Sequence, residues 1–356
     1  MYNIVGNIIE INNKKIGIGF EPYIVAEMSG NHNGKIENAL RLIKKAKEAG
    51  ADAIKLQTYK ANTITINHNS PEFLIEGGLW DGRNLYDLYE EAHTPWDWHK
   101  ELFEYAKEID ITIFSSPFDE TAIDLLEELN TPAYKIASPE IVDLNLIKKA
   151  ASTGKPIIFS TGMASKEEIK DALEAILSEN NKQIIVLHCT SAYPTPLDET
   201  NLSTLVDIQN SYKVLTGLSD HTLGTKISSY ACLLGACFIE KHFTLDRNNG
   251  GVDSTFSIEP EELKKLVKEC KEIKNIMGYP NFNITKSELA AYKARRSIYV
   301  VKNIKKGEFF TKNNIRSIRP GNGIKPKYID KILGLKASKD IKFGEPLSTD
   351  MINNFS

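Results

Sequence analysis

Residues 133–162, AYKIASPEIVDLNLIKKAASTGKPIIFSTG, contain the repeating pattern that predicts the fold. The short apolar run AYKIAS is followed by an amphipathic segment, Leu144–Thr153, and then by a second apolar run, PIIFSTG. Short apolar runs rich in β-branched residues are typical of buried parallel strands. This stretch therefore predicts a strand, a crossover helix and a second strand of one parallel sheet.

The same unit recurs along most of the chain. The other apolar runs are YIVAEMS (23–29), DAIKLQT (52–58), ITIFSS (111–116), IIVLHCT (184–190), VLTGLSD (214–220) and ACFIEKH (236–242). The other amphipathic segments are Ile36–Ala49, Trp98–Ile109, Thr121–Leu129, Lys166–Leu177, Leu202–Ile208, Thr225–Leu234 and Glu261–Met277. Eight strands that are each followed by a helix predict an α/β fold, a closed (β/α)8 TIM barrel. An open, doubly wound sheet is the alternative.

Two segments depart from the repeat in the first hundred residues. Ile4–Ile11 and Lys15–Phe20, separated by Asn12-Asn13, predict a hairpin ahead of the barrel. After the second strand comes a long insertion, Ala61–Pro95. Loops of this length are usually functional or disordered, and the tryptophans and tyrosines of this one favour an ordered loop.

The pattern changes after Met277. We predict a barrel domain over 1–277, a linker over 278–293 and a small second domain over 294–356. Three stretches of the small domain, 295–308, 313–324 and 334–348, contain short strand patterns, and Gly307 and Gly344 mark two related turns. A domain this small buries a modest core, so we expect it to dock on a partner.

Composition excludes several classes of protein. The net charge is −3, which argues against a nucleic-acid-binding protein. No apolar run approaches the ~18 residues of a membrane span, and the N-terminus lacks the features of a signal peptide. The four cysteines, Cys189, Cys232, Cys237 and Cys270, form no C-x-x-C pair. We expect free thiols and a cytoplasmic protein.

Polar side chains end every predicted strand, where the active site of a TIM barrel lies. Two lysines and four hydroxyls among them suggest an anion site: Lys55, Lys135, Ser116, Ser138, Ser160 and Ser219. Each lysine has an alternative role, an ion pair with an acidic neighbour inside the barrel. A Schiff base on one lysine, as in some aldolases, is a further alternative.

His221 and His242 end adjacent predicted strands, one βα unit apart. Two imidazoles on neighbouring strands predict a divalent metal site that keeps positions open for water and substrate oxygens. Either histidine alone has an ordinary structural alternative, a hydrogen-bonded side chain. Among the remaining histidines, His32, just after the first strand, is the best candidate for a site residue.

A series of motifs in a fixed order resembles the sialic acid synthase family. They are AEMSGNHNG, KLQTY, SSPFD, YKIAS-x-E, STGM, HCTSAYPTP, GLSDHT, EKHFT and RPGNGI, and they span Pro22 to about Ile352. The resemblance implies a barrel joined to an antifreeze-like (SAF) domain in a domain-swapped homodimer. In that arrangement the small domain of one subunit caps the active site of the other.

The resemblance also implies a reaction, the condensation of phosphoenolpyruvate with an amino-sugar aldehyde. The implied phosphoenolpyruvate ligands are the two lysines and four serines above, together with Ser191. His221 and His242 would bind Mn2+, Mg2+ or Co2+. Glu140 would assist the addition of water, and Glu27 would contact the sugar or the water shell of the metal. The implied sugar contacts are Gln57, Tyr193, Asp253 and Arg319, the last reaching across the dimer.

The insertion LWDGRNLYDLYEEAHTPWDWH (79–99) looks most like that of pseudaminic acid synthases. It implies 2,4-diacetamido-2,4,6-trideoxy-L-altrose as the acceptor and a place in flagellin glycosylation. The alternatives are an N-acetylneuraminate or legionaminic acid synthase, a class I aldolase and a non-catalytic sugar-binding protein. Ser191 stands where neuraminic acid synthases carry an asparagine. Pro139 also departs from the family pattern and would shape the turn that presents Glu140.

Overall fold

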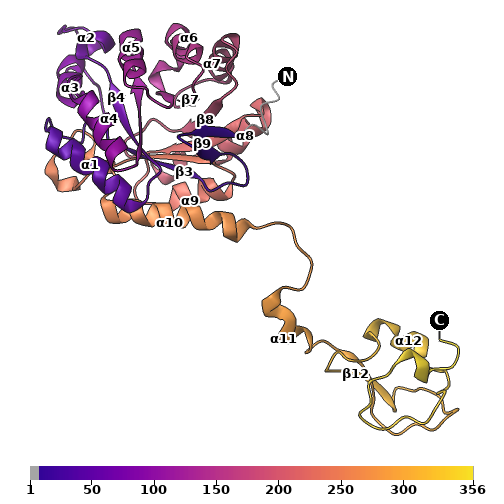
Figure 1. Ribbon diagram of the computed structural model, residues 1–356. Helices are drawn as coiled ribbons and strands as arrows, with labels where there is room; N and C mark the ends of the chain where they lie inside the picture. Colours follow the sequence, from indigo (N-terminus) through magenta and orange to yellow (C-terminus); the bar gives the residue numbers. More distant parts are fainter. Residues whose placement is uncertain (1–7, 356) are drawn as a thin grey trace. The chain divides into compact units, whose positions relative to one another are not determined.

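The computed structural model describes residues 8–355, which divide into two compact units with the boundary after Gly278 (Figure 1). Within the described residues no helix is both long enough and apolar enough to span a bilayer. The first unit contains the predicted β/α repeat, and the second contains the small C-terminal domain.

The first unit is a closed barrel of eight parallel strands. This confirms the predicted fold and shows that the alternative, an open doubly wound sheet, is wrong. The strands pair in the order β10-β3-β4-β5-β6-β7-β8-β9, so the last strand returns to the first. Their bounds are β3 Tyr23–Glu27, β4 Ala53–Thr58, β5 Thr112–Pro117, β6 Tyr134–Ile136, β7 Ile157–Ser160, β8 Ile184–Cys189, β9 Leu215–Asp220 and β10 Phe238–His242.

Helices follow the strands around the outside of the barrel (Figure 1). Their bounds are α1 Ile36–Ala49, α4 Trp98–Glu108, α5 Glu120–Glu128, α6 Leu144–Ser152, α7 Lys166–Ser178, α8 Ser203–Tyr212, α9 Lys226–Leu233 and α10 Pro260–Met277. Most begin and end close to the predicted positions. The sixth, α8, extends beyond the predicted Leu202–Ile208, because Tyr212 also packs into the core although polar residues separate it from Ile208.

A short hairpin precedes the barrel. Strands β1 (Ile9–Ile11) and β2 (Lys14–Ile16) pair around Asn12 and Asn13, whose φ angles of 46° and 63° suit a two-residue hairpin turn. The part of the predicted first strand before residue 8 lies outside the described residues. The second strand ends at Ile16, earlier than the predicted Phe20. Ile9, Ile11 and Ile16 pack with inward-facing barrel residues.

The side chains of each barrel strand alternate between two environments, as the period of two requires. Outward-facing residues join the core between sheet and helices, for example Ile24, Ile54 and Ile239. Inward-facing residues near the strand starts, such as Val25 and Phe238, fill the barrel with the hairpin. The inward-facing residues that follow them along the strands are polar, and they form the site described below.

One buried ion pair joins β9 and β10 on their outward faces. Asp220 and Lys241 are register partners on neighbouring strands, and the carboxylate and ammonium lie 2.9 Å apart in full burial. Lys241 also donates to the carbonyl of Thr222, and Asp220 accepts from the hydroxyl of Ser228. This network fixes the ends of the two strands next to the site: His221 follows β9 directly, and His242 is the last residue of β10.

The insertion between β4 and α4 is ordered and contains two helices, α2 (Ala61–Ile64) and α3 (Leu85–Ala92). The C-terminal unit contains α11 (Leu289–Tyr292), the antiparallel pair β11 (Ser297–Val300) and β12 (Ile315–Ile318), and α12 (Ile329–Ile332). The third predicted strand stretch, 334–348, contains only isolated bridges, such as Ile304 with Ile341. The two predicted turns are present, with φ angles of 85° at Gly307 and 89° at Gly344.

The Asp220–Lys241 pair predicts a large loss of stability when one partner is removed. Lys241→Met leaves the carboxylate buried without its cation, which costs about 3–5 kcal/mol. The matched control is Lys149→Met, because Lys149 and Asp124 form an exposed pair at 2.7 Å. That change should cost less than about 1 kcal/mol. Urea unfolding of the full chain measures both, and equal midpoints for the two variants would contradict the assignment.

Candidate active site

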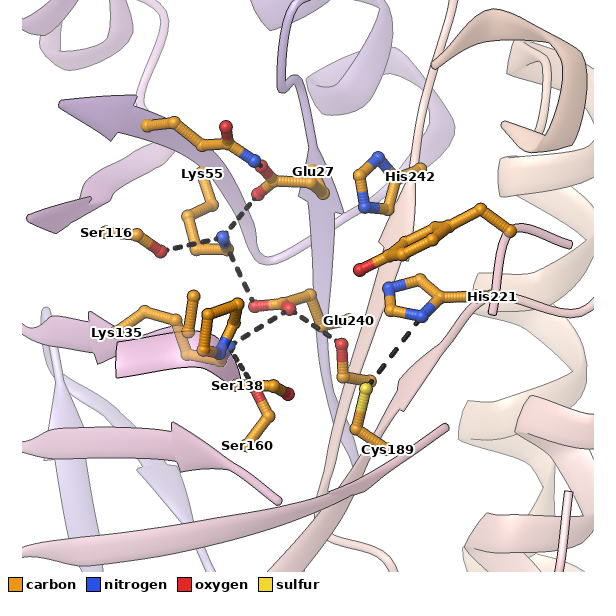
Figure 2. A pocket seen from close by; sticks show the side chains of 15 residues that line it. Glu27, Lys55, Ser116, Lys135, Ser138, Ser160, Cys189, His221, Glu240 and His242 are labelled. Atoms are coloured by element: carbon orange, nitrogen blue, oxygen red, sulfur yellow. Dashed lines mark hydrogen bonds and ion pairs between the residues drawn. The ribbon is translucent and has the colours of Figure 1, made fainter. Parts of the chain in front are cut away.

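The polar ends of the barrel strands surround one pocket (Figure 2). Side chains from all eight strands or the residues just after them line it. They are Glu27, Lys55, Gln57, Ser116, Lys135, Ala137, Ser138, Pro139, Ser160, Cys189, Tyr193, Ser219, His221, Glu240 and His242. Most of the site residues predicted from sequence are therefore brought together.

Two lysines and two glutamates form the charged centre of the pocket. The Lys55 ammonium lies 2.6 Å from the Glu27 carboxylate and 3.6 Å from that of Glu240. The Lys135 ammonium lies 3.5 Å from the same Glu240 carboxylate. All four side chains are buried. Each lysine therefore has the acidic neighbour that the ion-pair alternative requires, and Glu240 is the partner of both lysines.

The environment shifts the pKa values of these four groups in different directions. Burial raises the pKa of Glu27 to about 7, although Lys55 opposes the shift. Burial also raises the pKa of Glu240, but Lys135 and Lys55 outweigh it and the net shift is downward. Burial lowers the pKa of Lys135, whereas at Lys55 the two carboxylates outweigh burial and raise it. Near neutral pH, Glu27 is thus the carboxyl group of the cluster that exchanges a proton most easily.

Hydroxyl groups surround the two ammonium groups. Lys55 donates to Ser116 Oγ at 3.0 Å, and Lys135 donates to Ser160 Oγ at 2.5 Å. Ser219 donates to Glu240 at 3.0 Å. Ser138 Oγ accepts from the backbone N–H of Gly162 at 3.0 Å. Ammonium and hydroxyl donors thus point into one small volume, as a polyanionic ligand requires.

Gly162 shows how closely this part of the pocket is packed. A Cβ atom at this position would lie 2.1 Å from Ser191 Oγ and 2.8 Å from Ser138 Oγ. Any larger residue would displace one of the two hydroxyls. The glycine of the STGM motif therefore gives the Ser138 and Ser191 hydroxyls their space.

His221 and His242 lie side by side on the other wall of the pocket, with ring centroids 5.3 Å apart (Figure 2). Nδ1 of His221 lies 3.0 Å from the carbonyl of Thr190 and, as N–H donor to it, leaves Nε2 available. Burial and the neighbouring His221 lower the pKa of His242 well below its usual value, so its imidazole is neutral at pH 7. Its Nδ1 is buried without a hydrogen-bond partner.

The neutral His242 ring, whose Nδ1 has no partner, fits a metal ligand. Burial lowers the pKa of His221, but Cys189 and the Thr190 carbonyl outweigh it and raise this pKa, so His221 has to lose its proton before it can hold an ion. Among residues 8–355, no three histidine, cysteine, aspartate or glutamate side chains are grouped closely enough to hold an ion by themselves. Water and substrate oxygens would have to complete the coordination, as in a catalytic site with open positions.

Aromatic rings continue the wall beyond the two histidines. The Tyr193 ring lies 4.3 Å from the His221 ring and 5.2 Å from that of Phe256. On the opposite side, Gln57 donates to Glu27 at 3.0 Å. The charged groups thus lie on one side of the pocket, and the two histidines and the Tyr193 ring lie on the other.

Four predicted site residues do not line the pocket. Asp253 lies just behind His242, 3.7 Å from its Nδ1, and accepts a hydrogen bond from Ser29. Ser191 Oγ lies 4.0 Å from Cys189 Sγ. Burial raises the pKa of Glu140, which follows the lining residue Pro139, to about 7. Arg319 belongs to the C-terminal unit and is described only within it.

Besides Ala137, two lining residues had no assigned role in the sequence-based prediction. Glu240 occupies the charged centre, and Cys189 Sγ lies 3.8 Å from His221 Nδ1. The strand period could have found Glu240, because residues 238, 240 and 242 share one face of β10. The same period places Cys189 on the inward face of β8 with Leu187.

Comparisons with known proteins agree with this geometry. Residues 42–281 match the NeuB family, and residues 295–353 match the SAF domain. The pseudaminic acid synthase of Helicobacter pylori is 46% identical over 93% of this chain and 98% of its own length. The N,N'-diacetyllegionaminic acid synthase of Campylobacter jejuni is 40% identical over 90% and 97%.

A solved structure is also similar, the N-acetylneuraminic acid synthetase of Leptospira borgpetersenii in complex with citrate. It is 33% identical, with a TM-score of 0.72 over 80% of this chain and 95% of that one. The family models match most of both units, and the relatives align along nearly their whole length. The barrel pocket also contains the predicted strand-end groups. This chain therefore belongs to the NeuB family of sialic acid synthases and carries a C-terminal SAF domain.

Proposed function

We propose that the protein is a pseudaminic acid synthase, which condenses phosphoenolpyruvate with 2,4-diacetamido-2,4,6-trideoxy-L-altrose and releases phosphate. The observation that carries the proposal is the convergence of Lys55 and Lys135 with a pair of imidazoles at one barrel mouth. The choice of acceptor is supported by the greater identity to the pseudaminic acid synthase, 46% against 40% for the legionaminic acid synthase.

Phosphoenolpyruvate binds on the charged side of the pocket. Lys55 and Lys135 supply the cations, and the hydroxyls of Ser116, Ser138 and Ser160 donate to its carboxylate and phosphate oxygens. Glu27 and Glu240 would repel this anion if both stayed ionised. Glu27, with a pKa of about 7, can accept a proton and so reduce the repulsion.

His221 and His242 are the proposed ligands of a divalent ion, Mn2+, Mg2+ or Co2+. When bound, it supplies Lewis-acid polarisation of the acceptor aldehyde and orients the two substrates. Glu27, Gln57 and Asp253 lie around the histidines, where they would contact the acceptor or the water shell of the ion. Tyr193 packs beside them and limits access of bulk water.

The carbon–carbon bond forms between C3 of phosphoenolpyruvate and the aldehyde carbon, whose oxygen takes up a proton. Water then adds to the electron-deficient C2. Glu140 is the proposed base for this water, because its pKa of about 7 lets it accept a proton at neutral pH. The tetrahedral intermediate breaks its C2–O bond, phosphate leaves, and C2 becomes the ketone of the product.

The C-terminal unit completes the site in the proposed homodimer, with Arg319 of one subunit reaching the acyl group of the acceptor bound to the other. The support for this arrangement is the SAF match together with the RPGNGI motif. We also propose that the protein works in the cytoplasm, since all four cysteines are free and buried.

The acceptor assignment predicts a definite product. Enzyme incubated with phosphoenolpyruvate and the altrose derivative should give pseudaminic acid and stoichiometric phosphate, detected by mass spectrometry and a phosphate assay. The acceptors of neuraminic and legionaminic acid synthases serve as the comparison. Higher kcat/KM with either of them would make the chain another member of the family, and trapping of an imine by borohydride would favour an aldolase.

The metal assignment predicts that chelation stops the reaction. EDTA should abolish phosphate release, and added Mn2+, Mg2+ or Co2+ should restore it. His221→Ala should lower kcat at least about a hundredfold, since electrostatic stabilisation by an ion is worth several kcal/mol. His68→Ala is the matched control, because His68 is exposed in the insertion and contacts Ser70. Full turnover in excess EDTA after metal stripping would refute the assignment.

A further inference from the structure

The insertion after β4 carries a hairpin whose tip contains Trp80. Leu74 and Asn84 pair at its base, and Ile75 and Arg83 continue the backbone hydrogen bonds. The tip is rich in glycine, with φ angles of 75° at both Gly77 and Gly78 and 76° at Gly82. These positions demand residues without a Cβ and make a sharp, narrow tip.

Trp80 attaches this tip to the mouth of the barrel. Its indole N–H donates to the carbonyl of Val252 at 3.0 Å, across 172 residues of sequence. Its ring lies 5.4 Å from the ring of Tyr193, at an interplanar angle of 55°. Trp80 is half-buried, so part of its ring remains accessible.

The ring contacts define an order that leads from the pocket lining outward to Trp80, which lies next to the lining residues and not among them. The His221 ring contacts Tyr193 at 4.3 Å, and Tyr193 contacts Trp80 at 5.4 Å. Lys55 and Lys135 lie across the pocket from His221 (Figure 2). An acceptor whose aldehyde lies by the histidines must extend its remote end away from the lysines, toward the aromatic residues.

We propose that Trp80 forms the wall of the acceptor subsite and packs against the end of the sugar that is remote from its aldehyde. This inference rests on the proposed function and adds a specificity residue to it. The proposed acceptor carries a methyl group at C6 and two acetamido groups, which offer apolar surface to an aromatic ring. The lysines and serines on the charged side of the pocket offer no such surface.

The same geometry predicts which kinetic constants Trp80 controls. It lies beyond Tyr193 from the histidines and outside the charged centre, so phosphoenolpyruvate binding should not depend on it. Loss of the ring should therefore raise the acceptor KM and leave the phosphoenolpyruvate KM unchanged. An aromatic contact of this kind corresponds to about a tenfold change in affinity.

The test compares Trp80→Ala with two further variants of the full-length enzyme. Trp80→Phe keeps an aromatic ring but removes the N–H donor to Val252. Trp96→Ala is the matched control, since Trp96 lies in the same insertion and also donates to a carbonyl, that of Tyr59 at 3.1 Å. Steady-state kinetics with the altrose acceptor and phosphoenolpyruvate, together with melting temperatures, are measured for all three.

We expect an acceptor KM about tenfold higher for Trp80→Ala, near wild type for Trp80→Phe and unchanged for Trp96→Ala. An unchanged acceptor KM in Trp80→Ala would overturn the inference while leaving the proposed function intact. An equal increase of the acceptor KM in Trp80→Ala and Trp96→Ala would also overturn it, because the effect would then belong to the whole insertion. An equal rise of the phosphoenolpyruvate KM in Trp80→Ala would overturn it as well, because the effect would then concern the whole site. A wild-type enzyme inactive on this acceptor would instead refute the proposed function, and this inference with it.

Discussion

One carboxylate, that of Glu240, joins the two cations on which the proposed chemistry depends. Lys55 and Lys135 come from different strands, and each ammonium lies within 3.6 Å of this side chain. Without Glu240, two buried like charges would repel each other and lower each other's pKa. The Glu240 carboxylate therefore offsets the repulsion between the two ammonium groups. Glu27, whose pKa is raised to about 7, can take up a proton when an anion binds beside it.

The closed barrel could be predicted because its strands obey a simple rule of alternation. In β10, Ile239 and Lys241 point outward and Phe238, Glu240 and His242 point inward, so one strand contributes to core, ion pair and site. The family prediction is likewise confirmed, since residues 42–281 match the NeuB family and a relative aligns over 93% of the chain. The polar strand ends predicted which side chains converge, because parallel strands of a barrel all end at one rim.

Contacts that depend on loop conformation could not be predicted in this way. The interaction of Trp80 with Val252 joins residues far apart in sequence, and no periodicity connects a hairpin tip to a distant loop. The pairing of both lysines with Glu240 depends on side-chain directions inside the barrel, which residue order alone leaves open. The prediction of a third strand in the C-terminal unit was wrong, because the short apolar stretches there form isolated β-bridges instead of a continuous ladder.

The central claim is that the lysine cluster binds phosphoenolpyruvate, and its most direct test is calorimetric titration of the full-length enzyme with this ligand alone. Lys135→Met should weaken binding at least about tenfold, because a hydrogen bond to a charged group is worth roughly 1.5–3 kcal/mol. Lys155→Met, which removes an ion pair with Glu127 on the outside of the barrel, should leave the affinity unchanged. Equal affinities of wild type and Lys135→Met would contradict the account.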